Sequence, residues 1–176
     1  MNKSHPHWQY FISIESDLER TGRYVEIAPA NFKAYSIEFA RILLSASSEV
    51  DVVSKLVCEG IDRNKSYETI DHYRESIISR YPRFHAFEIT VPRYGLVRKP
   101  WEDWRNGKNP AWWRSHNNVK HQRHKFFEEA NLENAIDAVA ALFCMVLAYD
   151  HDVLKMSPWP KLLSVEEDMM VDMVFN

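Results

Sequence analysis

The segment that follows Asn131 constrains the fold of this chain more than any other. Its apolar residues at helical spacing include Leu132, Ile136, Val139, Ala140, Phe143 and Leu147. A helix that is apolar on much of its surface must be enclosed by other elements, as the central helix of a bundle is. The side chain of Asn131 can accept hydrogen bonds from the first N–H groups of such a helix, so the helix is predicted to begin there.

Other segments repeat apolar residues at three- and four-residue steps and are predicted to surround this helix. The strongest covers residues 31–60, and shorter ones cover residues 8–22 and 66–79. Residues 82–109 instead combine an alternating stretch with a turn signal, which is typical of a hairpin or an extended loop. The sequence predicts an all-α fold, a single bundle of four to five helices with a short β-hairpin or loop insertion near 82–109.

Length and composition indicate one globular domain. The chain has 176 residues, of which 45% are hydrophobic and 27% charged, enough for a core of its own. We assign the bundle to residues 1–156 and a separate acidic, Met-rich segment to 157–176. No signal peptide and no membrane span are expected. Cys58 and Cys144 are too few for a disulfide framework, so we expect reduced thiols in a cytoplasmic protein.

Charge is unevenly distributed along the chain. Residues 89–127 contain nine Lys and Arg residues against two acidic ones, a net charge of +7, whereas the whole chain carries −3. The remaining residues therefore carry −10. A concentrated basic segment in an acidic protein favours a local anionic partner, although an ordinary solvated face gives the same pattern.

The centre of the basic segment, residues 109–127, reads NPAWWRSHNNVKHQRHKFF and has no acidic residue. Asn109 can cap a helix and Pro110 suits its first position. The side chains that fall on one face of this helix are Arg114, Asn117, His121 and Lys125. The apolar ones on the opposite face are Trp112, Val119 and Phe126. One helix is thus expected to hold an apolar stripe against the core and a cationic row away from it.

Arg114 and His121 are seven residues apart, roughly 10 Å along one face of a helix. Arg binds a phosphoryl group through paired hydrogen bonds and stays charged, and His exchanges protons near neutral pH. Together they suffice for cleavage of RNA through its own 2′-hydroxyl group, a reaction that needs no metal. The alternative is that this face meets only water.

The same residues resemble the motif of the HEPN superfamily, all-helical domains of prokaryotic toxins, abortive-infection systems and RNA-processing factors. That motif is an Arg, four to six further residues and a His near the start of a late helix. Arg114, six residues and His121 match it, and the resemblance covers residues 31–152. The residue after Arg is typically Asn, Asp or His in the family, whereas here it is Ser115.

The resemblance implies a metal-independent endoribonuclease, usually a symmetric homodimer, with RNA as substrate and an antitoxin protein as a further partner. Arg114 and His121 would be catalytic, with Asn117 positioning the substrate. The further residues expected to bind nucleic acid are Lys120, Lys125, Arg123, His116, His124 and Trp113. The alternative is a non-catalytic HEPN-like module that binds RNA, a nucleotide or an acidic protein partner through the same face.

Three other sets of residues carry open alternatives. A row on the 31–60 helix either lines the same cleft or is an exposed face with local ion pairs; it consists of Glu38, Arg41, Ser45 and Glu49. His116, His121 and His124 suggest a metal site, and His121 and His124 are spaced to chelate one ion. The segment has no Asp or Glu to complete such a site, although distant His72, His151 or Asp152 could contribute, so we expect no metal and no cofactor. The tryptophans either stack on RNA bases or close a small core; we favour the core for Trp112 and leave Trp113 open.

Overall fold

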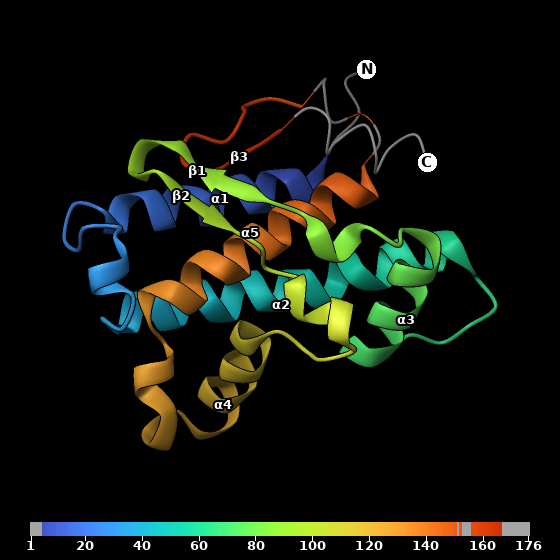
Figure 1. Ribbon diagram of the computed structural model, residues 1–176, viewed down its shortest axis with the longest axis horizontal. Helices are drawn as coiled ribbons and strands as arrows, with labels where there is room; N and C mark the ends of the chain where they lie inside the picture. Colours follow the sequence, from blue (N-terminus) through green and yellow to red (C-terminus); the bar gives the residue numbers. More distant parts are fainter. Residues whose placement is uncertain (1–4, 151, 153–155, 167–176) are drawn as a thin grey trace.

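A computed structural model describes residues 5–150, 152 and 156–166 of the chain (Figure 1). Its α-helices are α1 (Pro6–Thr21), α2 (Ile37–Ile61), α3 (Ile70–Arg80), α4 (Ala111–Phe126) and α5 (Leu132–Tyr149). Its strands are β1 (Ile89–Val91), β2 (Leu96–Arg98) and β3 (Ser164–Val165). The predicted all-α bundle with a hairpin insertion near residues 82–109 is confirmed.

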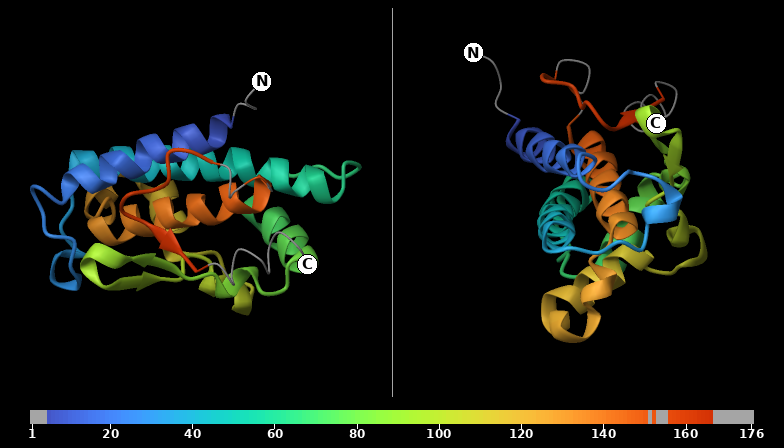
Figure 2. Two further views of the ribbon diagram at one scale, coloured as in Figure 1. Left: turned by 90° about the horizontal axis from the view of Figure 1, so that it is seen from above. Right: turned by 90° about the vertical axis from the view of Figure 1, so that its left-hand side faces the viewer.

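Helix α5 is the centre of the molecule. Every residue from Ala138 to Ala148 is buried. Helices α1 and α2 pack on one side of α5, and the β1–β2 hairpin covers the other, as the end-on view in Figure 2 shows. The contact between α2 and α5 is the most extensive in the fold. The apolar pattern of this segment thus becomes the core of the bundle.

Helices α2, α3 and α5 begin at capping side chains, though not always at the ones that the sequence suggests. Asn131 caps α5 as predicted, since its side chain accepts from the backbone N–H of Asn134 at 3.0 Å. Helix α2 begins later than expected, after Ser36, and Asn31 lies in a separate 3-10 turn. Helix α3 is capped by Thr69 rather than by a serine three residues earlier.

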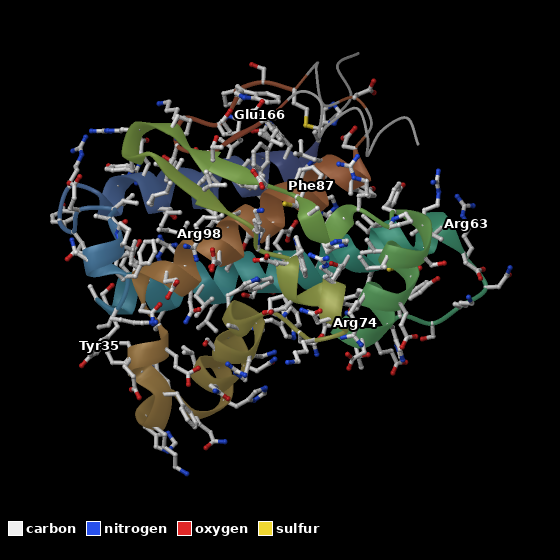
Figure 3. All side chains as sticks on the ribbon, in the orientation of Figure 1. Tyr35, Arg63, Arg74, Phe87, Arg98 and Glu166 are labelled. Carbon is white, nitrogen blue, oxygen red and sulfur yellow. The ribbon has the colours of Figure 1, made fainter. Side chains whose placement is uncertain are left out.

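The hairpin is joined to α5 by an ion pair as well as by apolar contacts. Arg98 at the end of β2 donates from Nε and Nη2 to both carboxylate oxygens of Asp137, at 2.6 and 2.8 Å. The same guanidinium donates to Glu133 at 3.3 Å and lies over the ring of Phe32, 5.0 Å from its centroid. In Figure 3, Arg98 lies between the hairpin and α5. Arg98 therefore binds both carboxylates on the polar side of α5, where Lys33 also pairs with Glu133 at 3.0 Å.

Residues 157–166 are part of the same packed unit. Strand β3 pairs antiparallel with β1 and completes a three-stranded sheet in the order β2-β1-β3. The Trp8 indole donates to the Pro158 carbonyl at 3.0 Å, and the backbone N–H groups of Leu162 and Leu163 donate to the buried carboxylate of Glu15. The boundary predicted at residue 157 therefore falls within packed structure. The acidic, Met-rich residues 167–176 lie outside the described residues.

The composition of helix α5 bears on the expectation that the sequence contains no membrane-spanning segment. By length and composition it is apolar enough to cross a membrane, with a mean hydropathy of 1.6 over 18 residues, although no such segment was expected. In this fold 78% of that helix is buried by other elements. The core helix of a bundle meets the same criterion, and burial explains its composition here.

We expect Phe143→Ala to lower the free energy of unfolding by about 3–5 kcal/mol, because it empties space at the centre of the core. Phe143 is fully buried and stacks on Phe11 with ring centroids 4.8 Å apart. The matched control is Tyr24→Ala, which removes an aromatic side chain that is 87% exposed. Urea unfolding of both variants checks this, and equal losses would contradict the assignment of the core.

Candidate nucleic-acid interface

Helix α4 lies at the edge of the bundle and contacts α2 and α5 through one face (Figure 1). That face contains Trp112 and Val119, as predicted, and both are buried. The Trp112 indole donates to the Pro100 carbonyl at 2.8 Å and packs edge-on against Trp101, with centroids 5.3 Å apart. Trp104 completes this aromatic cluster. Trp101, Trp104 and Trp112 are therefore core residues, not base-stacking surfaces.

The helix differs from the prediction at both ends. Asn109 does not cap it: α4 starts after Pro110, without a side-chain cap, and the Asn109 side chain accepts from Arg74 of α3 instead. Near the other end the backbone leaves the helical region at Gln122, with φ −142° and ψ 45°. The predicted continuous face therefore ends after His121, and the later basic residues follow a kink.

A row of basic side chains is exposed along α4. Arg114, Lys120 and His121 precede the kink. Arg123, His124 and Lys125 follow it and are also exposed. Over the described part of the chain, no ion pair involves any of these six residues. The expected separation of apolar and cationic faces is therefore present for the regular part of α4, and its charges are available to an anion.

An open pocket of about 700 Å³ lies beside Arg114, between α4, α3 and the loop before α4. We call it the Arg114 pocket. It is lined by Ile70, Asp103, Lys108, Asn109, Ala111, Trp113, Arg114, Asn117 and Asn118. It thus joins two predicted catalytic residues, Arg114 and Asn117, but His121 is not among its lining residues. A second, smaller pocket beyond the kink is lined by Arg123, His124 and Phe127.

Trp113 has a different environment from the other tryptophans of this region. It is half-buried and lines the Arg114 pocket. Its ring packs edge-on against Trp112, with centroids 5.7 Å apart, and lies 5.1 Å from the ring of His116. Trp113 therefore packs against the core with one part of its ring and borders the pocket with another. Both alternatives that the sequence left open for it remain compatible with this position.

His116 does not belong to the exposed row. Only 6% of it is accessible, and its Nδ1 atom has no hydrogen-bond partner in the described residues. Burial lowers its pKa to about 4, and the nearby positive charge of Lys120 acts in the same direction. Ser115 is buried too. Direct contact of His116 with nucleic acid is therefore unavailable in this arrangement, although the sequence suggested it.

A partly exposed polar cluster lies between α2 and α3, close enough to His116 to act on its charge. The Asp51 carboxylate of α2 accepts from the Tyr73 hydroxyl of α3 at 2.7 Å and from Lys55 Nζ at 2.6 Å. Burial, and then the bond to Asp51, raise the pKa of Tyr73. Asp51 acts electrostatically on His116 as well, in the direction that raises its pKa. The cluster thus joins α2 to α3 by a hydrogen bond and acts on α4 through charge alone.

The polar row of α2 is directed toward α1. Arg41 donates to Asp17 of α1 and to Glu38, both at 2.6 Å. Glu49 Oε1 lies 2.6 Å from His7 Nδ1, also of α1, and Ser45 is half-buried. Arg41 and Glu49 thus pair with α1, and Glu38 pairs with Arg41 within α2. Among the described residues none of these contacts joins the row to Arg114 or His121, so the prediction that it lines the same cleft finds no support there.

Neither cysteine is placed for reactivity. Cys58 and Cys144 are free and buried, and burial raises the pKa of Cys58 to about 11. Within the described ranges, no group of three or more His, Cys, Asp or Glu side chains is arranged to hold a metal ion.

Two features of the site were missed from the sequence. The segment before α4 contributes three lining residues to the Arg114 pocket, namely Asp103, Lys108 and Asn109. The spacing of residues in the sequence does not predict the path of this segment. The burial of His116 did have a signal, because it follows Trp112 by four residues and therefore shares its face of the helix.

Comparison of the chain with protein-family models, curated proteins and solved structures finds no match in any of the three. Chemically, the site offers unpaired cations, amides and an aromatic ring around an open pocket, with an accessible histidine farther along the same helix. Such a set can bind a phosphate-bearing ligand and exchange a proton.

The buried state of His116 predicts a pH dependence of stability. Because its pKa is about 4 in the folded chain and 6.5 as its ordinary value, the unfolded chain binds more protons between these pH values, and stability falls as the pH falls. We expect the wild type to lose about 3 kcal/mol relative to His116→Leu between neutral pH and about pH 4. Urea unfolding of both proteins across this range is the measurement. If the free energies of unfolding of the two proteins changed in parallel with pH, His116 would not be buried in its neutral form.

Proposed function

We propose that this protein is a metal-independent endoribonuclease of HEPN type that acts through the exposed face of α4. The observation that carries the proposal is that Arg114 and His121 are both exposed on the regular part of α4, and neither pairs with an acidic residue in the described ranges. The sequence resemblance supplies the activity class. A cytoplasmic effector that acts as a homodimer, with an antitoxin partner where it serves as a toxin, belongs to the same proposal.

The position of the kink supports a joint role for the two residues. Helical geometry places residues seven apart at nearly the same angle and about 10 Å apart along the axis. Gln122, where the helix breaks, directly follows His121, so the break leaves this geometry intact. An RNA backbone along α4 would meet Arg114 at one end of the row and His121 near the other.

The proposed reaction is an internal transfer of the phosphoryl group. The 2′-oxygen of the RNA forms a bond to phosphorus as the bond to the 5′-oxygen breaks, giving a 2′,3′-cyclic phosphate and a 5′-hydroxyl end. The 2′-hydroxyl loses a proton and the leaving 5′-oxygen gains one. His121 carries out one of these two transfers and water the other. Arg114 stabilises the additional charge on the phosphate oxygens, and Asn117 positions the strand.

We expect His121→Ala and Arg114→Ala each to reduce the rate of RNA cleavage in EDTA by at least about 100-fold, the usual contribution of a proton-transfer or charge-stabilising group. The measurement is cleavage of a mixed RNA pool, with the product ends identified as cyclic phosphates. Arg23→Ala is the matched control, because Arg23 is an exposed arginine in the loop after α1. Unchanged cleavage in both site variants would refute the proposal.

The second candidate function is RNA binding without cleavage. It is favoured by the fact that the Arg114 pocket contains Arg114 and Asn117 but not His121. It also fits the burial of Ser115, at the position where the HEPN motif typically has Asn, Asp or His. Under this reading α4 attracts a nucleic acid or an acidic protein partner through charge alone.

In either case RNA affinity should depend on salt, since bound cations displace counterions from the strand. We expect Lys120→Ala and Lys125→Ala each to weaken binding and to reduce the slope of log affinity against log salt by about 0.7 for single-stranded RNA. Fluorescence anisotropy at several salt concentrations measures this, with Arg23→Ala as control. Identical slopes for all four proteins would place the RNA elsewhere.

A further inference from the structure

We propose that the Arg114 pocket binds the base of one unpaired nucleotide, with an adjoining phosphate on Arg114. The inference rests on the proposed function, because an RNA strand along α4 is what would bring the nucleotide there. It adds base recognition to a face that otherwise offers only charge. The pocket volume, about 700 Å³, falls within the range of roughly 300–1,000 Å³ that is usual for sites of small ligands.

Trp113 supplies the surface on which a base can stack. It lines the pocket and remains half-buried, while the other three tryptophans near it are fully enclosed. Its contacts with Trp112 on one side and His116 on another fix the orientation of the ring before any ligand arrives. A ring already held in place loses little conformational freedom on stacking, which favours affinity.

Two amides of the pocket each use one polar atom within the protein. Asn109 accepts from Arg74 Nη1 at 2.8 Å, and Arg74 is held in turn by Asp71 at 2.7 Å. Asn117 donates from Nδ2 to the Trp113 carbonyl at 3.2 Å. The Nδ2 of Asn109 and the Oδ1 of Asn117 have no partner among the described residues. Asn118, the third amide that lines the pocket, donates from Nδ2 to the Glu129 carboxylate and keeps its Oδ1. A donor and two acceptors thus remain among the described residues, and the edge of a nucleobase presents complementary groups.

The charges of the pocket are suited to a nucleotide rather than to a bare anion. Arg114 and Lys108 line it, and neither forms an ion pair within the described residues. Asp103 is a third charged group of the wall, and its carboxylate repels phosphate but accepts from the amino group of a base. A mixed set of this kind favours a ligand with a phosphate at one end and hydrogen-bond donors at the other.

The test compares a short single-stranded RNA with an analogue of the same length that lacks every base. The two have the same phosphates, so any difference in affinity is due to the bases. We expect the wild type to bind the normal RNA at least about tenfold more tightly, the usual contribution of one stacked base. Competition against a fluorescent RNA gives both dissociation constants.

Variants then assign the base contribution to the pocket. Trp113→Leu should reduce the tenfold advantage to near unity, because it removes the stacking surface. Asn109→Ala should reduce it in part, because it removes one hydrogen-bond donor, whereas Arg23→Ala should retain it. Asn109 is exposed in a loop before α4, so this variant tests the pocket even where loss of Trp113 disturbs the fold.

The outcomes separate this inference from the proposed function. Equal affinity for the two strands overturns base recognition and leaves RNA binding through charge intact. An advantage that persists in both pocket variants places the base elsewhere and overturns the assignment. Failure of the protein to bind either strand overturns both proposals. A base advantage without His121-dependent cleavage supports the pocket and refutes the nuclease.

Discussion

The enclosure of α5 is the constraint on which the rest of the structure depends. Eleven consecutive residues from Ala138 to Ala148 are buried, so elements must cover this helix on every side along that length. Helices α1 and α2 cover one side and the hairpin the other. Its polar positions lie near its start, where Arg98 binds Glu133 and Asp137. The β1–β2 hairpin is therefore needed to cover α5.

Helix α4 is outside this enclosed core, and that position explains its character. Only one of its faces is needed for packing, where Trp112 is anchored to the Pro100 carbonyl and the aromatic cluster. The opposite face is thus available for cations that a core could not tolerate unpaired. The loop before α4 and the N-terminal end of α3 come together beside it through the Arg74–Asn109 bond. A rigid bundle with a peripheral, charged helix is a suitable scaffold for binding an extended anion.

Elements governed by local pattern were predictable from the sequence, and those governed by distant contacts were not. The apolar stripe of α4 and the cap at Asn131 follow from spacing and residue type, and the exposure of Arg114 and His121 follows from the same geometry. The kink at Gln122 lacks the proline or glycine that usually signals one. The pocket beside Arg114 brings Ile70 together with residues more than thirty positions later. The sequence pattern of either segment alone does not predict this proximity, because it depends on how α3 packs against the rest of the bundle.

The buried carboxylate of Glu15 joins the first helix to residues near the end of the described chain, and this has a consequence for the order of folding during synthesis. Glu15 belongs to the first helix, and its hydrogen-bond donors are the backbone amides of Leu162 and Leu163. A ribosome adds Leu162 and Leu163 only after it has synthesised the helices α1 to α5. Until then, α1 carries an ionisable group that has no partner in its native site, and burying it is unfavourable. Vectorial synthesis thus delays the final packing of α1 until the last strand is released.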